Sequence, residues 1–190
     1  SYIRQAAESL SELINDVLDL AKIEAGKLTV RPAPFAVGEL FSALRGMLRP
    51  LLVTDRVTLV FDDPEALPLL HSDEGKVSQI LRNFLSNALK FTERGVIRVS
   101  ASLTPAGDAV VFAVADTGIG IAPADQATIF EEFTQLDHPL QQRVRGTGLG
   151  LPLCKKLADL LGGSVAVHSV PGAGSTFSTV IPLQYRETPT

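Results

Sequence analysis

The sequence has few of the features that would tie it to a disulfide framework, a membrane or a polyanion. Its 190 residues include one cysteine, Cys154, which excludes an internal disulfide and a cysteine-based zinc site and is expected to be a small core residue of a helix. No apolar run approaches the roughly 20 residues that span a bilayer, and no signal peptide opens the chain. The formal charge of -4 is not clustered, and no basic tract favours nucleic acid as a partner.

Two well-known phosphate-binding signatures are also absent. Gly146, Gly148 and Gly150 follow the spacing G-x-G-x-G, which differs from the dinucleotide-binding G-x-G-x-x-G. The segment EAGKLT at 24–29 has Gly-Lys but lacks the first Gly and the adjoining Ser/Thr of a P-loop. The three histidines lack metal-ligand spacing, and each is expected to be an ordinary surface or strand-end residue: His71, His138 and His168.

What is present indicates a globular domain of α+β class. A hydrophobic content of 45% is ample for a packed core. The expected helices cover 2–25, 38–52, 73–91 and 151–161, and the expected strands cover 57–62, 95–103, 109–116, 164–170 and 175–183. An irregular stretch precedes Gly150. Because this order has no regular βαβ repeat, it favours a two-layer α/β sandwich, with helices on one face of a mixed sheet, over a Rossmann-type fold.

The first helix carries an apolar stripe with a seven-residue repeat. Its members are Ile3, Ala6, Ala7, Leu10, Leu13, Ile14, Val17, Leu20 and Ala21. A single helix of this length is marginal in water, so the stripe indicates partner helices. The alternative is an amphipathic helix folded onto its own domain. Because Ser1 already lies in this helix, we expect the sequence to be an excised fragment. Gly26 is expected to end the helix, and residues 27–37 (KLTVRPAPFAV) are expected to form a strand and a Pro-rich connector, the likeliest domain boundary.

Asn83 and Asn87 lie one turn apart on the helix expected at 73–91, and Lys90 follows. Asparagine is a poor interior helix residue, because its amide competes for the backbone. A carboxamide oxygen suits Mg²⁺, which takes few protein oxygens alongside phosphate, and Lys90 could reach the same phosphates. The alternative is a solvated helix surface.

Asp116 closes the buried strand expected at 109–116 and is followed at once by Gly118 and Gly120. A buried carboxylate needs a partner, so either a backbone donor or an arginine satisfies it, or it forms the floor of a pocket for a ligand with a donor. Further along, Gly146, Gly148 and Gly150 precede a helix with a proline in its first turn. Backbone N–H groups freed there can face an anion at the positive end of the helix dipole, although the glycines could also form a plain flexible turn.

Together these motifs resemble the catalytic and ATP-binding domain of sensor histidine kinases, members of the Bergerat-fold (GHKL) superfamily with gyrase, the ninety-kilodalton heat-shock chaperones and MutL. Paired asparagines, D-T-G-I-G after a strand, a stretch with Phe130 and Phe133, G-T-G-L-G-L, and late Gly172 and Gly174 occur in the family's order. The resemblance implies a partial dimerisation and histidine-phosphotransfer domain (its second helix) at 1–26, a linker at 27–36, the catalytic domain at 37–186 and a tail at 187–190.

The resemblance also implies the roles of individual residues. Asp116 accepts the adenine amino group, Asn87 holds Mg²⁺, Asn83 supports the metal or its water, and Lys90 and the glycine amides hold the phosphates. Thr176 helps to fix the adenine-side hydrogen bonds. The full set implied at the ATP site is Asn83, Asn87, Lys90, Phe91, Asp116, Gly118, Ile119, Gly120, Ile121, Phe133, Arg145, Gly146, Thr147, Gly148, Leu149, Gly150 and Thr176.

The sequence departs from the family at three places. The superfamily's ATP hydrolases have Glu where Asn83 stands, and an amide cannot act as a general base, so transfer is favoured over hydrolysis. Arg145 replaces a common Gly, and residues 138–142 lack the usual Ser/Thr/Arg character. No histidine fits the phosphoacceptor by position or neighbour, so this fragment is expected to bind Mg·ATP without autophosphorylating.

The resemblance implies partners and a location as well. The partners would be ATP, the phosphoacceptor histidine helix of the parent kinase, a response regulator or receiver domain, and a second copy in a parent homodimer. The location would be a cytoplasmic domain. The alternatives are a gyrase- or chaperone-like ATPase, a serine kinase of the anti-sigma type, and a degenerate kinase acting as a non-catalytic interaction module.

Overall fold

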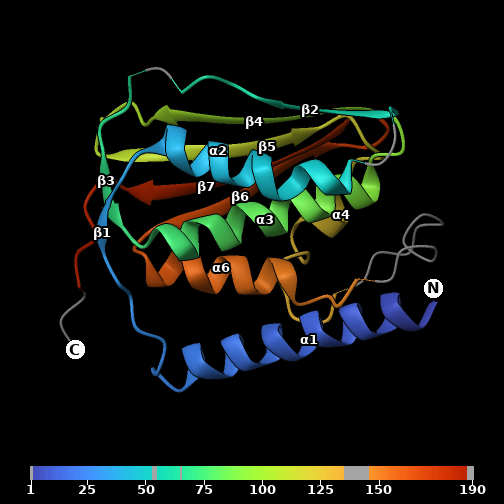
Figure 1. Cartoon of the computed structure of the whole chain (residues 1–190), viewed down its shortest axis with the longest axis horizontal. Helices are drawn as coiled ribbons and strands as arrows, with labels where there is room; N and C mark the ends of the chain where they lie inside the picture. The colour runs from blue at the N-terminus through green and yellow to red at the C-terminus, as the bar shows by residue number, and fades with distance from the viewer. Residues whose placement is uncertain (1, 53–54, 65, 135–145, 188–190) are drawn as a thin grey trace.

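The computed structural model describes residues 2–52, 55–64, 66–134 and 146–187 (Figure 1). Its centre is a five-stranded sheet in the order β2-β4-β5-β7-β6, in which β2 and β4 are parallel and the other neighbours antiparallel. The strands are β2 (Val57–Phe61), β4 (Gly95–Leu103), β5 (Ala109–Asp116), β6 (Ser164–Val170) and β7 (Gly174–Pro182).

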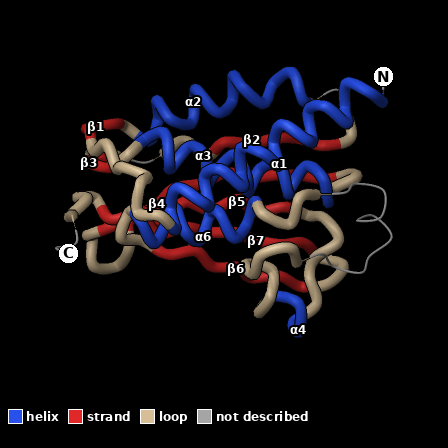
Figure 2. The backbone as a smooth tube through the Cα atoms, turned by 90° about the horizontal axis from the view of Figure 1, so that it is seen from below, coloured by secondary structure: helices blue, strands red, loops and turns tan. Residues whose placement is uncertain are grey.

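Three helices cover one face of this sheet: α2 (Val37–Leu48), α3 (Glu74–Phe91) and α6 (Gly150–Leu160) (Figure 2). On β5, Val110, Phe112 and Val114 alternate with less buried residues and point toward the helices, as a sheet covered on one face requires. Phe84 on α3 packs against Phe177 on β7 at a centroid distance of 5.5 Å. The predicted two-layer α+β fold, a mixed sheet with helices on one face, is confirmed.

A strand was expected within residues 27–37, where β1 (Ala33–Phe35) lies, whereas β3 (Leu70–Ser72) and α4 (Pro123–Gln126) were not predicted. A small antiparallel sheet pairs β1 with β3, and α4 lies in the stretch expected to be irregular. The helix expected at 38–52 ends as the 3-10 turn η1 (Arg49–Leu51). Elements as short as β3 and α4 carry too little periodicity to be recognised from one sequence.

The long first helix, α1 (Tyr2–Glu24), lies against the domain with its C-terminal half and ends as expected at Gly26. Gly26 has φ +64°, and the N–H of Lys27 donates to the carbonyl of Lys22 at 2.8 Å, which satisfies the helix end. Leu20 is buried, whereas Ile3 is 83% exposed and Leu10 57%. The stripe is therefore partly folded onto its own domain and partly open. In the part of the chain that the structure describes, no helix is both long and apolar enough to cross a membrane.

Asp73 joins the segment between α1 and β1 to the start of α3. Its carboxylate accepts from the backbone N–H of Lys76 at 3.2 Å, from the Lys76 ammonium at 2.8 Å and from the Arg31 N–H at 2.9 Å. Burial raises the pKa of Asp73, but the hydrogen bonds from Lys76 and Arg31 outweigh it, and the net pKa is lowered. The ionised carboxylate therefore holds both the start of α3 and the segment around Arg31.

We expect Asp73→Ala to lower the free energy of unfolding at pH 7 by about 1–3 kcal/mol, because it removes an N-cap and leaves donors unpaired. A carboxyl whose pKa is lowered by folding stabilises above its unfolded pKa, and this stabilisation is lost as pH falls through the folded pKa. The difference from wild type in urea unfolding should therefore shrink in acid. The exposed Asp63→Ala serves as control, and an Asp73→Ala effect no larger than this control would contradict the assignment.

Candidate functional site

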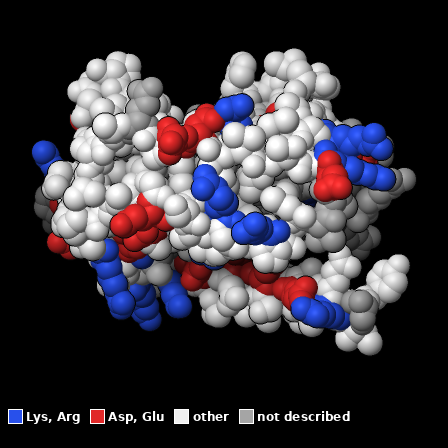
Figure 3. Space-filling view, turned by 45° about the horizontal axis from the view of Figure 1, so that its top comes forward, with Lys and Arg blue, Asp and Glu red and all other residues white. Residues whose placement is uncertain are grey.

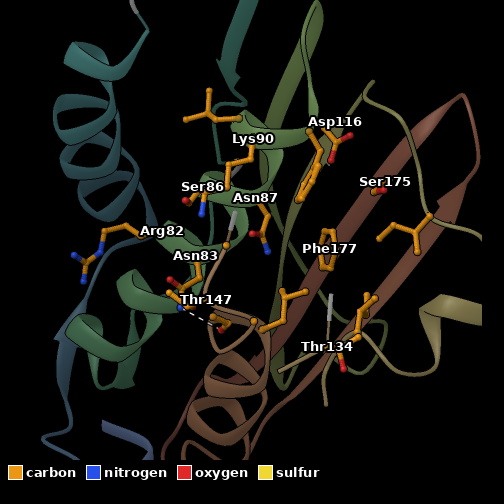
Figure 4. Close-up of a pocket in the computed structure, with 18 of the residues that line it drawn as sticks. Arg82, Asn83, Ser86, Asn87, Lys90, Asp116, Thr134, Thr147, Ser175 and Phe177 are labelled. Atoms are coloured by element: carbon orange, nitrogen blue, oxygen red, sulfur yellow. Dashed lines mark hydrogen bonds between the residues drawn. The ribbon is translucent and has the colours of Figure 1, made fainter. Parts of the chain in front are cut away.

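A cavity of about 1640 Å³ opens where α3, the end of β5, the glycine stretches and α1 meet (Figure 4). Residues separated by long stretches of sequence line it together. From the predicted set the lining includes Asn83, Asn87, Lys90, Phe91, Asp116, Ile119, Gly120, Ile121, Gly146, Thr147, Gly148 and Gly150. The structure thus brings most of the predicted residues to one site.

Asp116 lies at one end of this cavity, at the C-terminus of β5, and is 9% exposed. Its carboxylate accepts from the N–H of Gly118 at 2.9 Å and from the N–H of Ser175. Within the described residues it forms no ion pair with Lys or Arg. Burial raises the pKa of Asp116, and the two backbone donors lower it by less. Both alternatives left by the sequence therefore apply, since backbone donors hold the carboxylate while it still faces a cavity.

The glycines after Asp116 are required by close backbone approach. A Cβ on Gly118 would lie 2.3 Å from the carbonyl oxygen of Phe91. Gly120 has φ +71°, and a Cβ there would lie 2.2 Å from the carbonyl oxygen of Val170. Gly118 contributes its backbone N–H to Asp116 and does not itself appear in the cavity lining.

Thr176 does not line the cavity, which corrects the prediction. Side chains alternate across β7, so the buried Ser175 and Phe177 face the cavity and Thr176 faces the opposite side of the sheet. Ser175 pairs with Asp116 across the β5–β7 ladder. The sequence could have indicated Ser175, because residues two apart on a strand share a face and Ser175 lies two before the apolar Phe177.

The asparagine face of α3 is turned toward the cavity (Figure 4). Asn83 donates its amide N–H to the carbonyl of Gly150 at 3.3 Å and so ties α3 to the first turn of α6. The Lys90 ammonium lies 4.0 Å from where a Gly146 Cβ would be. Lys90 and the glycine loop thus approach each other across the cavity, with Asn87 beside them.

The second glycine stretch leads directly into α6. Gly148 has φ +72°, and a Cβ there would lie 3.0 Å from the Cα of Phe133. The Thr147 hydroxyl accepts from the N–H of Leu149 at 3.2 Å. Leu149 precedes α6 as its N-cap and is 1% exposed, so its side chain belongs to the core and not, as expected, to the cavity.

Two further predictions about the stretch before α6 have different outcomes. Phe133 does not line the cavity, and its side chain is 66% exposed. Its backbone has φ +58°, and its N–H donates to the carbonyl of Gly148 at 3.0 Å. Its role is therefore corrected from ligand contact to support of the glycine loop. Arg145 and residues 138–142 lie outside the described residues.

Sequence reasoning missed the contribution of α1, which lines the cavity with Glu12, Asn15, Asp16 and Asp19. Acidic side chains follow one another along this helix (Figure 3). The Thr147 hydroxyl donates to Asp16 at 3.5 Å, and Gln79 donates to Asp19 at 3.1 Å. The pKa of Asp16 is raised, first by burial and then by the negative charges of Glu12 and Asp19. The sequence could have indicated this face, because spacings of four and then three residues place Glu12, Asp16 and Asp19 on one side of the helix.

Cys154 on α6 is a core residue, as predicted. It is fully buried, and burial raises the pKa of its thiol to about 12, so it is inert as a nucleophile or ligand.

The comparison with protein families decides the affiliation. Residues 72–185 match the model of the "Histidine kinase-, DNA gyrase B-, and HSP90-like ATPase" family. The chain belongs to this family. The matched segment runs from the end of β3 past the end of β7 and contains the β5 carboxylate, both glycine stretches and the paired asparagines.

The similar curated proteins are sensor histidine kinases. The chain is 40% identical over 185 residues to the circadian input-output histidine kinase CikA of Synechococcus elongatus, covering 96% of this chain and 24% of that protein. It is 35% identical over 184 residues to the sensor histidine kinase RcsC of Escherichia coli, covering 95% of this chain and 19% of RcsC. The chain thus spans a quarter or less of the length of these relatives.

Solved structures confirm the fold. Full-length ShkA, solved in complex with AMPPNP, has a TM-score of 0.84 at 34% identity, covering 100% of this chain and 39% of that one. The catalytic domain of the histidine kinase ThkA has a TM-score of 0.69 at 25% identity, covering 81% of this chain and 97% of that one. The chain is therefore an ATPase-family domain of histidine kinase type, with the Bergerat fold.

Proposed function

We propose that this chain is the ATP-binding catalytic domain of a sensor histidine kinase, of simple or hybrid architecture. It would transfer the γ-phosphoryl group of ATP to a histidine on a dimerisation helix, for relay to an aspartate of a response regulator. The observation that carries this proposal is one cavity with a buried carboxylate at one end and Asn87, Lys90 and a glycine loop at the other. ATP and such regulators are cytoplasmic, and so would be the domain.

The two ends of the cavity suit the two ends of ATP. The ionised Asp116 accepts the exocyclic amino group of adenine and disfavours guanine, whose six-position carbonyl would face it unpaired. The backbone N–H groups at the start of α6 and the Lys90 ammonium face the phosphates. Catalysis would then consist of positioning and charge neutralisation, as is general for phosphoryl transfer.

The donor set fits a magnesium ion that is carried mainly by the nucleotide. Among the described residues no group of three or more His, Cys, Asp or Glu could hold a metal. Asn87 offers a neutral carboxamide oxygen beside the phosphate end, which suits an ion that keeps most of its waters. Bound there, Mg²⁺ would neutralise phosphate charge, and Asn87 would orient it while Asn83 supports the site.

Asn83 favours transfer over hydrolysis. Its amide cannot take a proton from water at neutral pH, and its N–H already donates to the carbonyl of Gly150. A water held near Asn83 would therefore lack a general base. This separates the chain from the ATP hydrolases of the superfamily, which carry a glutamate at this position by the resemblance described above.

We also propose that α1 is the second helix of a dimerisation and phosphotransfer domain, with the linker at 27–36 and the catalytic domain at 37–186. The support is the stripe of apolar side chains that remains exposed after α1 has docked: Ile3, Leu10, Ile14, Val17 and Leu18. Helices of this kind usually assemble in fours, two from each copy of a homodimer.

The kinase proposal is tested by phosphotransfer in trans. The chain is incubated with γ-labelled ATP, Mg²⁺ and a separately produced dimerisation domain of a sensor histidine kinase. We expect acid-labile label on the added domain and none on this chain. A dimerisation domain whose phosphoacceptor histidine is replaced by Gln is the matched control. Steady phosphate release without transfer would instead support an ATP hydrolase, and ATP binding with neither outcome would support a non-catalytic module.

Asn87→Ala is expected to abolish the part of ATP affinity that depends on Mg²⁺, because the carboxamide ligand is lost. Titrations with and without Mg²⁺ should differ in the wild type and coincide in the variant, with a loss of about 10- to 100-fold in Mg·ATP affinity. Ser86→Ala, one residue away on α3 and also lining the cavity, is the matched control and should keep the Mg²⁺ dependence. An unchanged dependence in Asn87→Ala would refute the role of Asn87.

A further inference from the structure

Two buried hydroxyl groups lie next to each other at the carboxylate end of the cavity. Ser169 on β6 and Ser175 on β7 are register partners, 8% and 7% exposed, with their oxygens 2.7 Å apart. Ser175 lines the cavity, and Ser169 lies behind it and does not. Neither hydroxyl was singled out by the sequence, and the proposed role of Asp116 does not require Ser169.

The hydrogen bonds of Ser169 favour one placement of the two hydroxyl protons. A serine hydroxyl has one proton to donate and two lone pairs to accept with. The N–H of Ile121 donates to the Ser169 oxygen at 2.7 Å, which uses one lone pair. The carbonyl of Gly174, at 2.9 Å, can only accept, so it takes the Ser169 proton. Either hydroxyl could donate in the contact between Ser169 and Ser175; with the Ser169 proton on the carbonyl of Gly174, Ser169 accepts with its second lone pair and Ser175 donates.

This assignment commits the Ser175 proton to Ser169 and leaves the Ser175 oxygen to face the cavity as an acceptor only. The neighbouring Asp116 carboxylate is also an acceptor. A ligand group that approaches this end must therefore bring donors, as an exocyclic amino group does, and a carbonyl finds no hydroxyl proton from Ser175.

We propose that Ser169 is a positioning residue for base selectivity, which holds the Ser175 proton away from the cavity so that a six-amino purine is favoured over a six-oxo purine. This inference rests on the proposed nucleotide site. Ser169 is itself firmly held, since Gln126 donates to its carbonyl at 3.0 Å and to the carbonyl of Ile121 at 2.9 Å. The loop after Asp116 and the β6–β7 hairpin thus share one network that ends at the two hydroxyls.

The test compares ATP with inosine triphosphate, which has a carbonyl in place of the six-amino group. Dissociation constants for both are measured by calorimetry on the whole chain. In Ser169→Ala the Ser175 proton is free to turn toward a carbonyl, so we expect the ratio of the inosine triphosphate constant to the ATP constant to fall at least about five-fold. Ser169→Thr keeps a hydroxyl and should retain the wild-type ratio.

Two further variants separate positioning from a general loss of structure. Thr179→Val removes another buried hydroxyl of the same strand pair, which donates to the carbonyl of Ser164 at 2.9 Å and does not line the cavity, so the ratio should not move. In a Ser175→Ala background, Ser169→Ala should have no further effect on the ratio, because the proton that it releases is absent.

The outcomes are distinguishable. An unchanged ratio in a folded Ser169→Ala protein overturns the inference while leaving the ATP site intact. The same holds if Ser169→Ala changes the ratio equally in the wild type and in the Ser175→Ala background. If Ser169→Ala does not fold, Ser169→Cys, whose thiol is a weak donor and acceptor, should lower the ratio in the same direction, and an unchanged ratio there overturns it equally. Failure of the wild type to bind ATP overturns both the proposed function and the inference.

Discussion

Asp116→Asn is expected to weaken ATP binding by about 10- to 100-fold, because a hydrogen bond to a charged acceptor contributes about 1.5–3 kcal/mol. The asparagine side chain would also have to choose between accepting from the Gly118 N–H and accepting from adenine, whereas the carboxylate can do both. The measurement is a calorimetric titration of each variant with ATP at constant Mg²⁺ concentration.

Stability separates this effect from misfolding. Because the pKa of Asp116 is raised in the folded state, the folded protein binds a proton more readily than the unfolded chain does, and the ionised group disfavours folding at neutral pH. A neutral Asn removes that cost, so the variant should unfold no earlier than the wild type in urea. In the wild type, ATP affinity should fall as the pH drops through the pKa of Asp116. Because this pKa is raised, the fall should occur at a higher pH than the titration of an ordinary aspartate.

The matched control is Asp108→Asn, just before the other end of β5. Asp108 accepts from the Thr104 hydroxyl at 2.9 Å in the turn between β4 and β5, away from the cavity. Its replacement should leave ATP binding unchanged. Equal affinities in Asp116→Asn and Asp108→Asn would show that the carboxylate does not contact the base.

Phe84→Ala is expected to lower the free energy of unfolding by about 3–5 kcal/mol, through lost transfer energy and the cavity left behind. Phe84 is fully buried on α3 between the two asparagines and packs on Phe177. A loss of this size is a large share of the roughly 5–15 kcal/mol that stabilises a typical domain, so the midpoint of urea unfolding should fall markedly. Urea unfolding followed by circular dichroism measures it.

Two variants test the cause of this loss. Phe84→Leu keeps most of the apolar volume and should lose markedly less stability than Phe84→Ala. Phe133→Ala removes the same side chain from a site that is 66% exposed and should change stability by no more than about 0.5 kcal/mol. A Phe84→Ala protein as stable as Phe133→Ala would contradict the packing described for α3 against the sheet.

The sequence was most informative where a pattern extended over several residues. The alternation in β5 and the stripe on α3 gave the bounds of both elements, and the polar residues that interrupt them, Asp116 and the asparagine pair, proved to lie at one cavity. A polar residue in a buried position is costly unless something requires it, and that cost is visible without a structure.

Other features depend on contacts between distant segments. The positions of Glu12, Asp16 and Asp19 at the cavity follow from how α1 docks, which no local pattern specifies. The pairing of Ser169 with Ser175 depends on hairpin register, because a slip of one residue would turn both hydroxyls to the other face of the sheet. The error at Thr176 was of a different kind and was avoidable, because the alternation set by Phe177 already indicates which residues of that strand share its face.

The central claim, that the cavity is an adenine nucleotide site, is tested most directly by titrating the whole chain with ATP and with GTP in the presence of Mg²⁺. We predict saturable binding of one ATP per chain, with GTP binding much more weakly. Absence of saturable ATP binding up to millimolar concentration, or equal affinity for ATP and GTP, would contradict the account.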